Sequence, residues 1–181
     1  MDAIGFLELN SIAKGIEAAD AMLKAAQVRL ISAKPSCPGK YNVLISGNVA
    51  AVQSSTDAGI AVASAHVVDQ LVIPRVHPQV IEAINMSAVP ERMNAVGILE
   101  YFSVAASILG ADAAVKAAEV TFLEVRLGMG IGGKSYVIMT GDVAAVEAGV
   151  AEGEAVAEDS GMLVSRVVIP NPHTDLYKSL F

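Results

Sequence analysis

The second half of the chain repeats the first. The segment Ala3–Val28 aligns without gaps on Ala95–Val120, and roughly half of the aligned positions are identical, which composition bias alone does not produce. Two shorter segments recur in the same order, each after a small insertion in the second copy: Gly39–Gln53 as Gly133–Glu147, and Leu71–His77 as Val167–His173. The chain is therefore a tandem duplication, and any fold assigned to one copy has to fit the other.

The duplication sets the expected domain boundary. A chain of 181 residues divides into two units of about 90 residues each. Between residues 87 and 94 the apolar pattern is interrupted by Pro90 and by the charged residues Glu91 and Arg92. We therefore expect two domains, residues 1–90 and residues 91–181. Units of this size have small cores, which packing of the two halves together would help to stabilise.

Each copy contains the same series of expected elements: a strand, a helix, two strands, a second helix and a final strand. In the first copy these elements cover residues 4–9, 12–26, 28–33, 41–46, 49–65 and 68–73. Ser11 and Ser103 precede the first helix of each copy, and Asn48 and Asp142 precede the second, as N-cap residues do. The pattern predicts an α+β fold in which helices cover one face of a small, mostly antiparallel sheet.

Charge and cysteine content exclude several classes of protein. The formal net charge is −7, whereas non-specific binding of nucleic acid requires clustered Lys and Arg, so we expect no nucleic-acid partner. The single cysteine excludes a disulfide within the chain, and it excludes a zinc ribbon or a ferredoxin built from one chain.

The apolar content raises the question of a membrane. Hydrophobic residues make up 54% of the chain and the mean hydropathy is +0.54. The longest uncharged run, Tyr41–Thr56, contains polar residues and is too short for a spanning helix. The first ten residues include Asp2 and Glu8 and no basic residue, unlike a signal peptide. We therefore expect no membrane partner and a cytoplasmic location.

A glycine-rich segment imitates a phosphate-binding loop. Residues 128–135 match G-x-x-x-x-G-K-[ST] and also contain G-x-G-x-x-G. Both motifs require a helix after the loop, because the helix N-terminus supplies the amides that hold phosphate. Here Lys134 leads instead into the strand-like residues 136–140, and the first copy has a similar loop at residues 35–41. We therefore expect a hairpin loop in each copy and no nucleotide site.

Cys37 is the most informative residue of these loops. A lone cysteine is most often a small buried hydrophobe. Its neighbours here, residues 35–40, include two prolines, a serine, a glycine and a lysine, which favour an exposed turn, and Lys34 and Lys40 would favour the thiolate. One thiolate is a poor metal site, but three of them, brought together by a symmetric oligomer, could hold an iron–sulfur cluster.

The remaining polar residues favour structural roles. His77 and His173 recur in both copies and are expected to close a turn, whereas His66 has no counterpart and is expected at the surface. Three kinds of charged residue also recur at equal positions: Glu8 and Glu100, Asp20 and Asp112, Lys24 and Lys116. No nucleophile, base and orienting group occur together in the pattern, so we do not expect an enzyme.

These motifs together resemble the tandem-domain shell proteins of bacterial microcompartments, which are built from BMC domains. The resemblance covers essentially the whole chain and includes A-I-G-F-L-E, A-A-D-A-M-L-K-A-A, the G-K loop and I-P-R-V-H. Within that family the chain is most similar to the iron–sulfur-cluster-binding shell proteins of propanediol-utilisation-type microcompartments. Their C-P-G-K loop is matched by Cys37–Lys40, and their G-I-G-G-K loop by Gly130–Lys134.

The resemblance implies two BMC domains per chain and a trimer that mimics a hexameric tile. Three loops containing Cys37 and three glycine-rich loops would meet at the central axis. The other pore-loop residues that the resemblance implies are Ser36, Pro38, Gly39, Lys40, Gly128, Met129, Gly130, Ile131, Gly132, Gly133 and Lys134. Three Cys37 thiolates would hold one 4Fe–4S cluster per trimer, and Lys40 and Lys134 would offset its negative charge.

The resemblance also implies where tiles meet each other. The edge lysine of the family falls on Lys24 and Lys116, and its edge arginine falls on Arg75, whereas the second copy has Asn171. We expect tile packing to be weaker or more selective at that position. The expected partners are two further copies of the chain, other microcompartment shell proteins, and a lumenal or cytosolic redox partner.

The implied function is that of a structural shell subunit whose pore carries electrons across the shell of a cytoplasmic microcompartment. Two alternatives remain open. In one, the pore of the tile gates a metabolite and Cys37 is a free thiol. In the other, the chain is a trimeric regulator that binds a small molecule, a role that small duplicated α+β units also serve.

Overall fold

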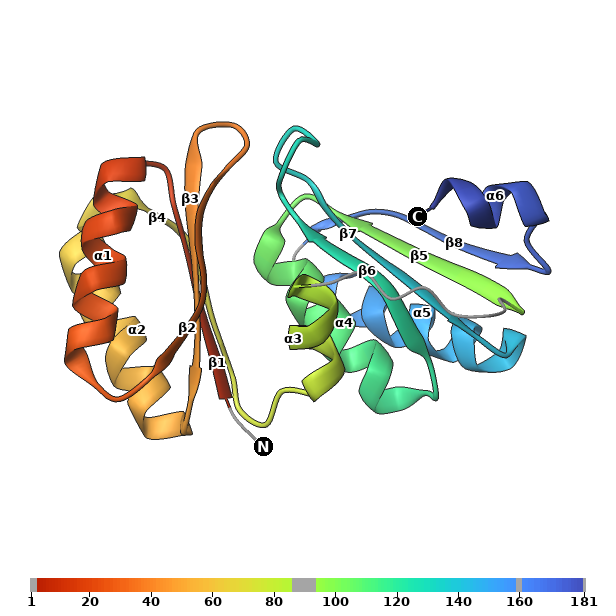
Figure 1. Ribbon diagram of the computed structural model, residues 1–181, viewed down its shortest axis with the longest axis horizontal. Helices are drawn as coiled ribbons and strands as arrows, with labels where there is room; N and C mark the ends of the chain where they lie inside the picture. The colour runs from red at the N-terminus through yellow and green to blue at the C-terminus, as the bar shows by residue number, and fades with distance from the viewer. Residues whose placement is uncertain (1–2, 86–93, 159–160, 181) are drawn as a thin grey trace. The chain divides into compact units, whose positions relative to one another are not determined.

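The computed structural model describes residues 3–85, 94–158 and 161–180 of the chain. The chain forms two compact units, residues 1–76 and residues 77–181. Each unit contains one four-stranded antiparallel sheet, and two long helices cover one face of that sheet (Figure 1). The α+β class and the antiparallel sheets predicted from the repeat are confirmed.

The first unit follows the predicted order of elements. Its elements are β1 (Ala3–Leu9), α1 (Ile12–Ala25), β2 (Arg29–Ser36), β3 (Lys40–Gly47), α2 (Val49–Ala63), the short 3₁₀ helix η1 (Ser64–His66) and β4 (Val67–Ile73). The strands pair in the order β2-β3-β1-β4. Strands β2 and β4 are therefore the two edges of this sheet.

The second unit repeats this arrangement. Its elements are α3 (Pro78–Asn85), β5 (Ala95–Tyr101), α4 (Val104–Ala117), β6 (Thr121–Leu127), β7 (Ser135–Gly141), α5 (Val143–Glu158), β8 (Leu163–Pro170) and α6 (Thr174–Ser179). The strands pair in the order β6-β7-β5-β8, with β6 and β8 at the edges. The helices α3 and α6, one after the last strand of each copy, are absent from the sequence-based expectation.

The duplication boundary differs from the boundary between the units. The predicted boundary between residues 90 and 91 falls within residues 86–93, which lie outside the described residues. By its contacts, α3 belongs to the second unit, where it packs against β6 and α4. A helix that the repeat attaches to the first copy is thus packed in the second unit.

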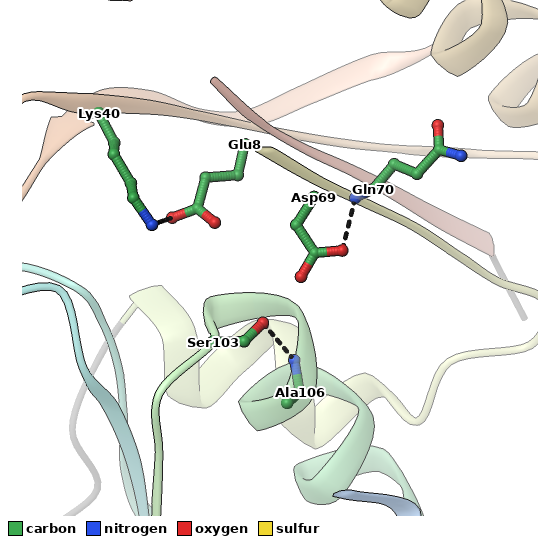
Figure 2. Close-up of polar contacts among 6 residues, drawn as sticks. All are labelled: Glu8, Lys40, Asp69, Gln70, Ser103 and Ala106. Carbon is green, nitrogen blue, oxygen red and sulfur yellow. Dashed lines mark hydrogen bonds and ion pairs between the residues drawn. The ribbon is translucent and has the colours of Figure 1, made fainter. Parts of the chain in front are cut away.

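Side-chain caps begin the helices where the sequence indicates. The Ser11 hydroxyl accepts a hydrogen bond from the Lys14 amide at 3.3 Å, and the Ser103 hydroxyl accepts one from the Ala106 amide at 3.2 Å (Figure 2). Asn48 caps α2 by accepting from the Ala51 amide at 2.8 Å. Each cap satisfies an amide that the first turn of a helix leaves without a partner.

The core of the first unit lies between the sheet and its two helices. It collects small aliphatic side chains from β1, α1, β3 and α2, among them Leu7, Met22, Val43 and Val52. Its one aromatic member, Tyr41, faces Leu9 across the β1–β3 ladder and lies against Gly15 of α1. A side chain at Gly15 would overlap the Tyr41 ring, so this glycine makes room for the tyrosine.

In the second unit the buried tyrosine lies on the other strand of the equivalent cross-strand residue pair. Tyr101 of β5 faces Ser135 of β7, at the positions of Leu9 and Tyr41. Its hydroxyl donates a 2.7 Å hydrogen bond to the Gly153 carbonyl of α5, and its ring lies against Gly110 of α4. Each unit thus buries one tyrosine at this pair and has a glycine beside it, which keeps the total core volume similar.

No helix within residues 3–85, 94–158 and 161–180 is both long and apolar enough to cross a bilayer.

Candidate functional site

The first loop is the tip of the β2–β3 hairpin. Strand β2 ends at Ser36, strand β3 begins at Lys40, and the Cys37–Pro38 peptide bond is cis. Gly39 has φ +78°, a conformation that L side chains rarely adopt, and a Cβ built there would meet no atom within 4 Å. Cys37 is half-buried and carries a free thiol. The hairpin therefore presents the cysteine at its tip, where the ribbon extends past the helices (Figure 1).

The second loop is the glycine-rich tip of the β6–β7 hairpin. Four of its glycines have positive φ: Gly128, Gly130, Gly132 and Gly133. Gly130 and Gly132 also face open space, because a Cβ at either position would touch nothing within 4 Å. Met129 is 52% exposed. The glycines serve the backbone path here rather than packing within this unit.

The glycine-rich loop is not followed by a helix. Lys134 leads directly into β7, which pairs with β5 and β6. A phosphate would therefore find no helix N-terminus at this loop. The predicted hairpin loop between two strands is confirmed.

Each loop lysine forms an ion pair with a glutamate of the central strand. The Lys40 ammonium lies 3.2 Å from a carboxylate oxygen of Glu8 (Figure 2), and the Lys134 ammonium lies 2.5 Å from that of Glu100. Glu8 and Glu100 occupy the same position of β1 and β5, so the pair is duplicated with the domain. The positive charge that was expected to face the loop thiolates is shared with these glutamates.

Glu8 is the more buried of the two glutamates. Its side chain is only 3% exposed, and desolvation by this burial raises its pKa above the usual value of 4.5, although the Lys40 ammonium lowers it. The negative charge of Asp69, whose carboxylate accepts a hydrogen bond from the Gln70 amide, adds to the increase in pKa (Figure 2). The pair is therefore a buried ion pair whose carboxylate is costly to ionise.

A second polar cluster supports the stem of the glycine-rich loop. Tyr136 of β7 donates a 2.7 Å hydrogen bond to Glu124 of β6, and the Arg126 guanidinium lies 5.8 Å from the centre of the Tyr136 ring. Arg126 also pairs with Glu124. Desolvation, and then the hydrogen bond to Glu124, raise the pKa of Tyr136 to about 12. The first copy has Ser32, Lys34 and Asn42 at these positions, so only the second hairpin has this cluster.

The two predicted edge lysines lie in different surroundings. Lys24 and Asp20 form a 2.5 Å ion pair in which both side chains are exposed, 75% and 60% respectively. Lys116 and Asp112 form the same pair, but Asp112 is only 9% exposed because the amide of His77 donates to it at 2.8 Å. Lys24 of α1 is thus more exposed than Lys116 of α4, whose side chain is 43% exposed.

The predicted edge arginine and its replacement share one backbone conformation. Arg75 has φ +56° and Asn171 has φ +48°. Asparagine is one of the residues that adopt this left-handed region most readily, whereas arginine is strained there. The departure of the second copy from the arginine therefore relieves backbone strain.

His77 and His173, which were expected to close a turn, directly precede the short helices α3 and α6. The Nδ1 atom of His77 accepts from the Gln79 amide at 3.4 Å, and that of His173 accepts from the Asp175 amide at 3.2 Å. His66 contacts Asn10 at the surface, with 2.8 Å between Nδ1 and Oδ1. His66 is exposed, as predicted.

Metal-ligating side chains are not grouped within the described residues of one chain: no three His, Cys, Asp or Glu side chains lie together as metal ligands would. Beside Cys37, the Ser36 hydroxyl is buried and has no hydrogen-bond partner. A cluster with several thiolate ligands would thus need Cys37 from more than one chain.

The sequence indicated the residues of the two loops, but not the residues that bind and position them. The recurrence of Glu8 and Glu100 was visible, yet their pairing with Lys40 and Lys134 depends on the register of β1 against β3, which the sequence does not specify. The Glu124–Arg126–Tyr136 cluster has no counterpart in the first copy, so the repeat could not indicate it. Alternation of polar residues along β6 and β7 was the one available signal.

Comparisons with known proteins agree with this architecture. The profile of the BMC domain matches residues 3–76 and residues 95–172. The bacterial microcompartment shell protein PduT of Citrobacter freundii is 46% identical over 178 residues, which cover 98% of this chain and 97% of that protein.

Solved structures are similar as well. The crystal structure of a microcompartments protein from Desulfitobacterium hafniense DCB has a TM-score of 0.93 and 57% identity, covering 98% of this chain and 99% of that one. The fused permuted hexameric shell protein MSM0275 from the RMM microcompartment has a TM-score of 0.67 and 19% identity, covering 87% and 84% of the two chains. This second likeness concerns the fold alone.

Proposed function

Because this chain belongs to the BMC domain family, with two such domains in tandem, we propose that it is a structural subunit of a bacterial microcompartment shell. Its similarity over nearly the full length to a bacterial microcompartment shell protein supports this role. A microcompartment shell lies in the cytoplasm, which is where we place the protein. A structural role needs no catalytic group, and other shell proteins are its expected partners.

We further propose that three chains form one tile with a pseudo-sixfold arrangement of domains. The two units have the same sheet order and the same hairpin, so each chain supplies two near-equivalent sectors of a ring. The hairpin tips, with glycines facing open space at positions 39, 130 and 132, leave room for loops of neighbouring chains. This arrangement makes the two loops of each chain the lining of a central pore.

The single observation that carries the functional proposal is the position of Cys37 at the tip of such a hairpin. A threefold axis would bring three Cys37 thiolates together, and thiolates are the usual ligands of 4Fe–4S clusters. When bound, such a cluster supplies one-electron transfer. The chain's own contribution is to orient the thiolate: the β2–β3 ladder holds the hairpin, and the Glu8–Lys40 pair anchors its second strand.

The cluster is tested by purification without oxygen. We expect about four iron and four sulfide per three chains, together with an electron spin resonance signal after reduction. Cys37→Ala should abolish both, whereas Ser36→Ala, at the neighbouring position, should retain them. An iron–sulfur signal that survives Cys37→Ala would remove Cys37 from the site.

The same preparation decides between electron transfer and metabolite gating. A tile that contains neither iron nor sulfide under strictly anaerobic conditions, and whose Cys37 reacts with a thiol reagent, would favour a metabolite pore.

Tiling is tested by electron microscopy of concentrated protein. We expect flat sheets or tubes, and Lys24→Asp should disperse them because Lys24 is exposed at the predicted edge. Lys14→Asp, at another lysine of α1, is the matched control and should leave the sheets intact. A trimer that never associates further, with or without Lys24, would favour a soluble regulator.

A further inference from the structure

The face of the first sheet opposite its helices carries a charged pair beside the Cys37 hairpin. Leu7 and Leu9 of β1 lie in the core with residues of α1 and α2, so Glu8 between them points to the opposite face. The Glu8 side chain is 3% exposed, and its carboxylate lies 3.2 Å from the Lys40 ammonium (Figure 2). Lys40 follows Cys37 at the other end of the hairpin turn. It therefore connects the cysteine loop to a buried carboxylate.

Asn42 offers an unused hydrogen-bond acceptor next to Glu8. It is the residue of β3 directly opposite Glu8 in the β1–β3 ladder, so both side chains lie on the same face of the sheet. The Asn42 Oδ1 atom is buried and has no hydrogen-bond partner among the described residues. An ionised carboxylate only accepts hydrogen bonds, whereas a protonated carboxyl group also donates one. The surroundings of Glu8 thus provide a cation for its ionised form and an acceptor for its protonated form.

The equivalent glutamate of the second unit is placed differently. Glu100 lies opposite Tyr136, whose hydroxyl already donates to Glu124 at 2.7 Å. The Glu100 side chain is also 30% exposed, so water can solvate its carboxylate. A buried carboxylate with an unpaired acceptor beside it is therefore a feature of the first unit, which is the unit that carries the cysteine.

Two charges from the neighbouring strands act on Glu8. Desolvation by burial raises its pKa most, the Lys40 ammonium on β3 lowers it, and Asp69, opposite Glu8 on β4, raises it. The exposed Lys34 lies one strand further away, on β2. A further negative charge near the Cys37 loop would draw the Lys40 ammonium away from the carboxylate and would repel the carboxylate itself. Both effects favour the protonated form of Glu8.

The hairpin tip suits a negatively charged group with sulfur ligands. Ser36, next to Cys37, is only 8% exposed, and its hydroxyl has no hydrogen-bond partner within the part of the chain that the structure describes. A hydroxyl can donate to a cluster-bound sulfur, and hydrogen bonds of this kind tune the reduction potential of a cluster. The loop thus has a donor beside its thiol and the Lys40 cation at its end, which a cluster with a net negative charge would favour.

We propose that Glu8 is the proton acceptor that is coupled to reduction of the 4Fe–4S cluster at Cys37. This inference rests on the cluster proposed above and deepens that function. When a one-electron donor reduces the cluster by one electron, one proton from the solvent binds to a carboxylate oxygen of Glu8, which becomes a neutral carboxyl group. Glu8 then donates to Asn42 Oδ1, and the released Lys40 ammonium faces the reduced cluster. One negative and one positive charge enter together, so the net charge of the site is conserved.

Redox titration at a series of pH values tests this coupling. Protein purified without oxygen is reduced stepwise with dithionite, and the spin resonance signal reports the reduced fraction. The reduction potential of the wild type should fall as the pH rises from the pKa that Glu8 has beside the oxidised cluster to the higher pKa that it has beside the reduced cluster. Glu8→Gln cannot take up a proton, so this fall in potential should be lost. Glu17→Gln removes an exposed carboxylate of α1 and should keep it.

Asn42→Leu tests the geometry of the site. It removes the acceptor for the protonated form and leaves Glu8 able to bind a proton, so the fall in potential should move to lower pH. Asn85→Leu, at an exposed asparagine of α3, should leave the potential at each pH unchanged. A curve for Asn42→Leu that coincides with the wild-type curve would overturn the hydrogen bond assigned to Asn42.

Infrared difference spectra detect the proton directly in the wild type. Subtraction of the spectrum of the oxidised protein from that of the reduced protein should give the C=O stretching band of a newly protonated carboxyl group. The band should be absent in Glu8→Gln and present in Glu17→Gln. A wild-type spectrum without this band at every pH at which the cluster is intact would contradict proton uptake by a carboxylate.

The outcomes separate this inference from the cluster on which it rests. A reducible cluster whose potential is the same at every pH, or whose pH dependence persists unchanged in Glu8→Gln, overturns the proton acceptor and leaves the cluster in place. Protein that contains neither iron nor sulfide when purified without oxygen overturns both.

Discussion

Single residues decide how the loop of the first unit is held. Glu8 lies on the central strand β1, accepts from Lys40 at 3.2 Å and is almost fully buried. Its burial raises its pKa, so the folded state binds the Glu8 proton more tightly than the unfolded state does. The ion pair that anchors Lys40 is therefore maintained at a cost in stability.

The raised pKa of Glu8 predicts that the free energy of unfolding depends on pH. Since the folded pKa exceeds 4.5, Glu8 contributes most stability below pH 4.5 and loses it as the pH rises through the folded pKa. In urea titrations, the free energy of unfolding of the wild type, minus that of Glu8→Gln, should fall as the pH rises from 4.5 through the folded pKa of Glu8. Glu17→Gln removes a charge from an exposed position and controls for net charge. A difference that stays constant or rises with pH would contradict the account.

The positive φ of Arg75 predicts a second effect at the residue scale. Arg75→Asn should raise the free energy of unfolding by about 0.5 kcal/mol, because asparagine tolerates the left-handed region better. Asn171→Arg should lower it by a similar amount, and the two variants control for each other. Thermal melting measures both, and changes of the same sign would show that the backbone is not the cause.

At the scale of elements, the crossing of α4 and α5 depends on Gly110 and Tyr101. A methyl group at Gly110 would overlap the Tyr101 hydroxyl and approach the Gly153 carbonyl to 3.1 Å. The first unit has Ala18 and Leu9 at the positions of Gly110 and Tyr101. Because Leu9 is smaller than Tyr101, the first unit has room for Ala18 in α1.

This comparison predicts coupled mutations. Gly110→Ala should destabilise the protein by about 2 kcal/mol, because the Tyr101 ring cannot move aside in a packed core. In a Tyr101→Leu background the same change should cost close to nothing, since the first unit tolerates that combination. Denaturant midpoints of the two single variants and the double variant measure the coupling. Additive effects would mean that the overlap is not the source of the cost.

The sequence predicts some of the helices and strands and not others. Periodicity, caps and the internal repeat predicted the strands and long helices, because these follow from local patterning. The helices α3 and α6 were missed, because α3 is stabilised by the edge of β6 and by Asp112 rather than by its own eight residues. The loop residues could be predicted from their glycines and Cys37, but not the glutamates that hold their lysines, because strand register sets those pairs.

At the scale of the whole molecule, the proposed trimer would turn the one cysteine of each chain into a feature of the assembly. In the proposed tile, three chains with two similar units each would complete a ring of six, and its threefold axis would make three Cys37 thiolates equivalent. In that tile the exposed apolar residues of α1 and β2 would be buried between chains. We therefore predict that assembly and cluster binding depend on the same threefold symmetry.

Native mass spectrometry of protein purified without oxygen tests this central claim most directly. The account predicts one dominant species of three 18.6 kDa chains plus the mass of a single 4Fe–4S cluster, and Cys37→Ala should yield the same three chains without it. A cluster bound to one chain, or a cluster mass that persists in Cys37→Ala trimers, would contradict it.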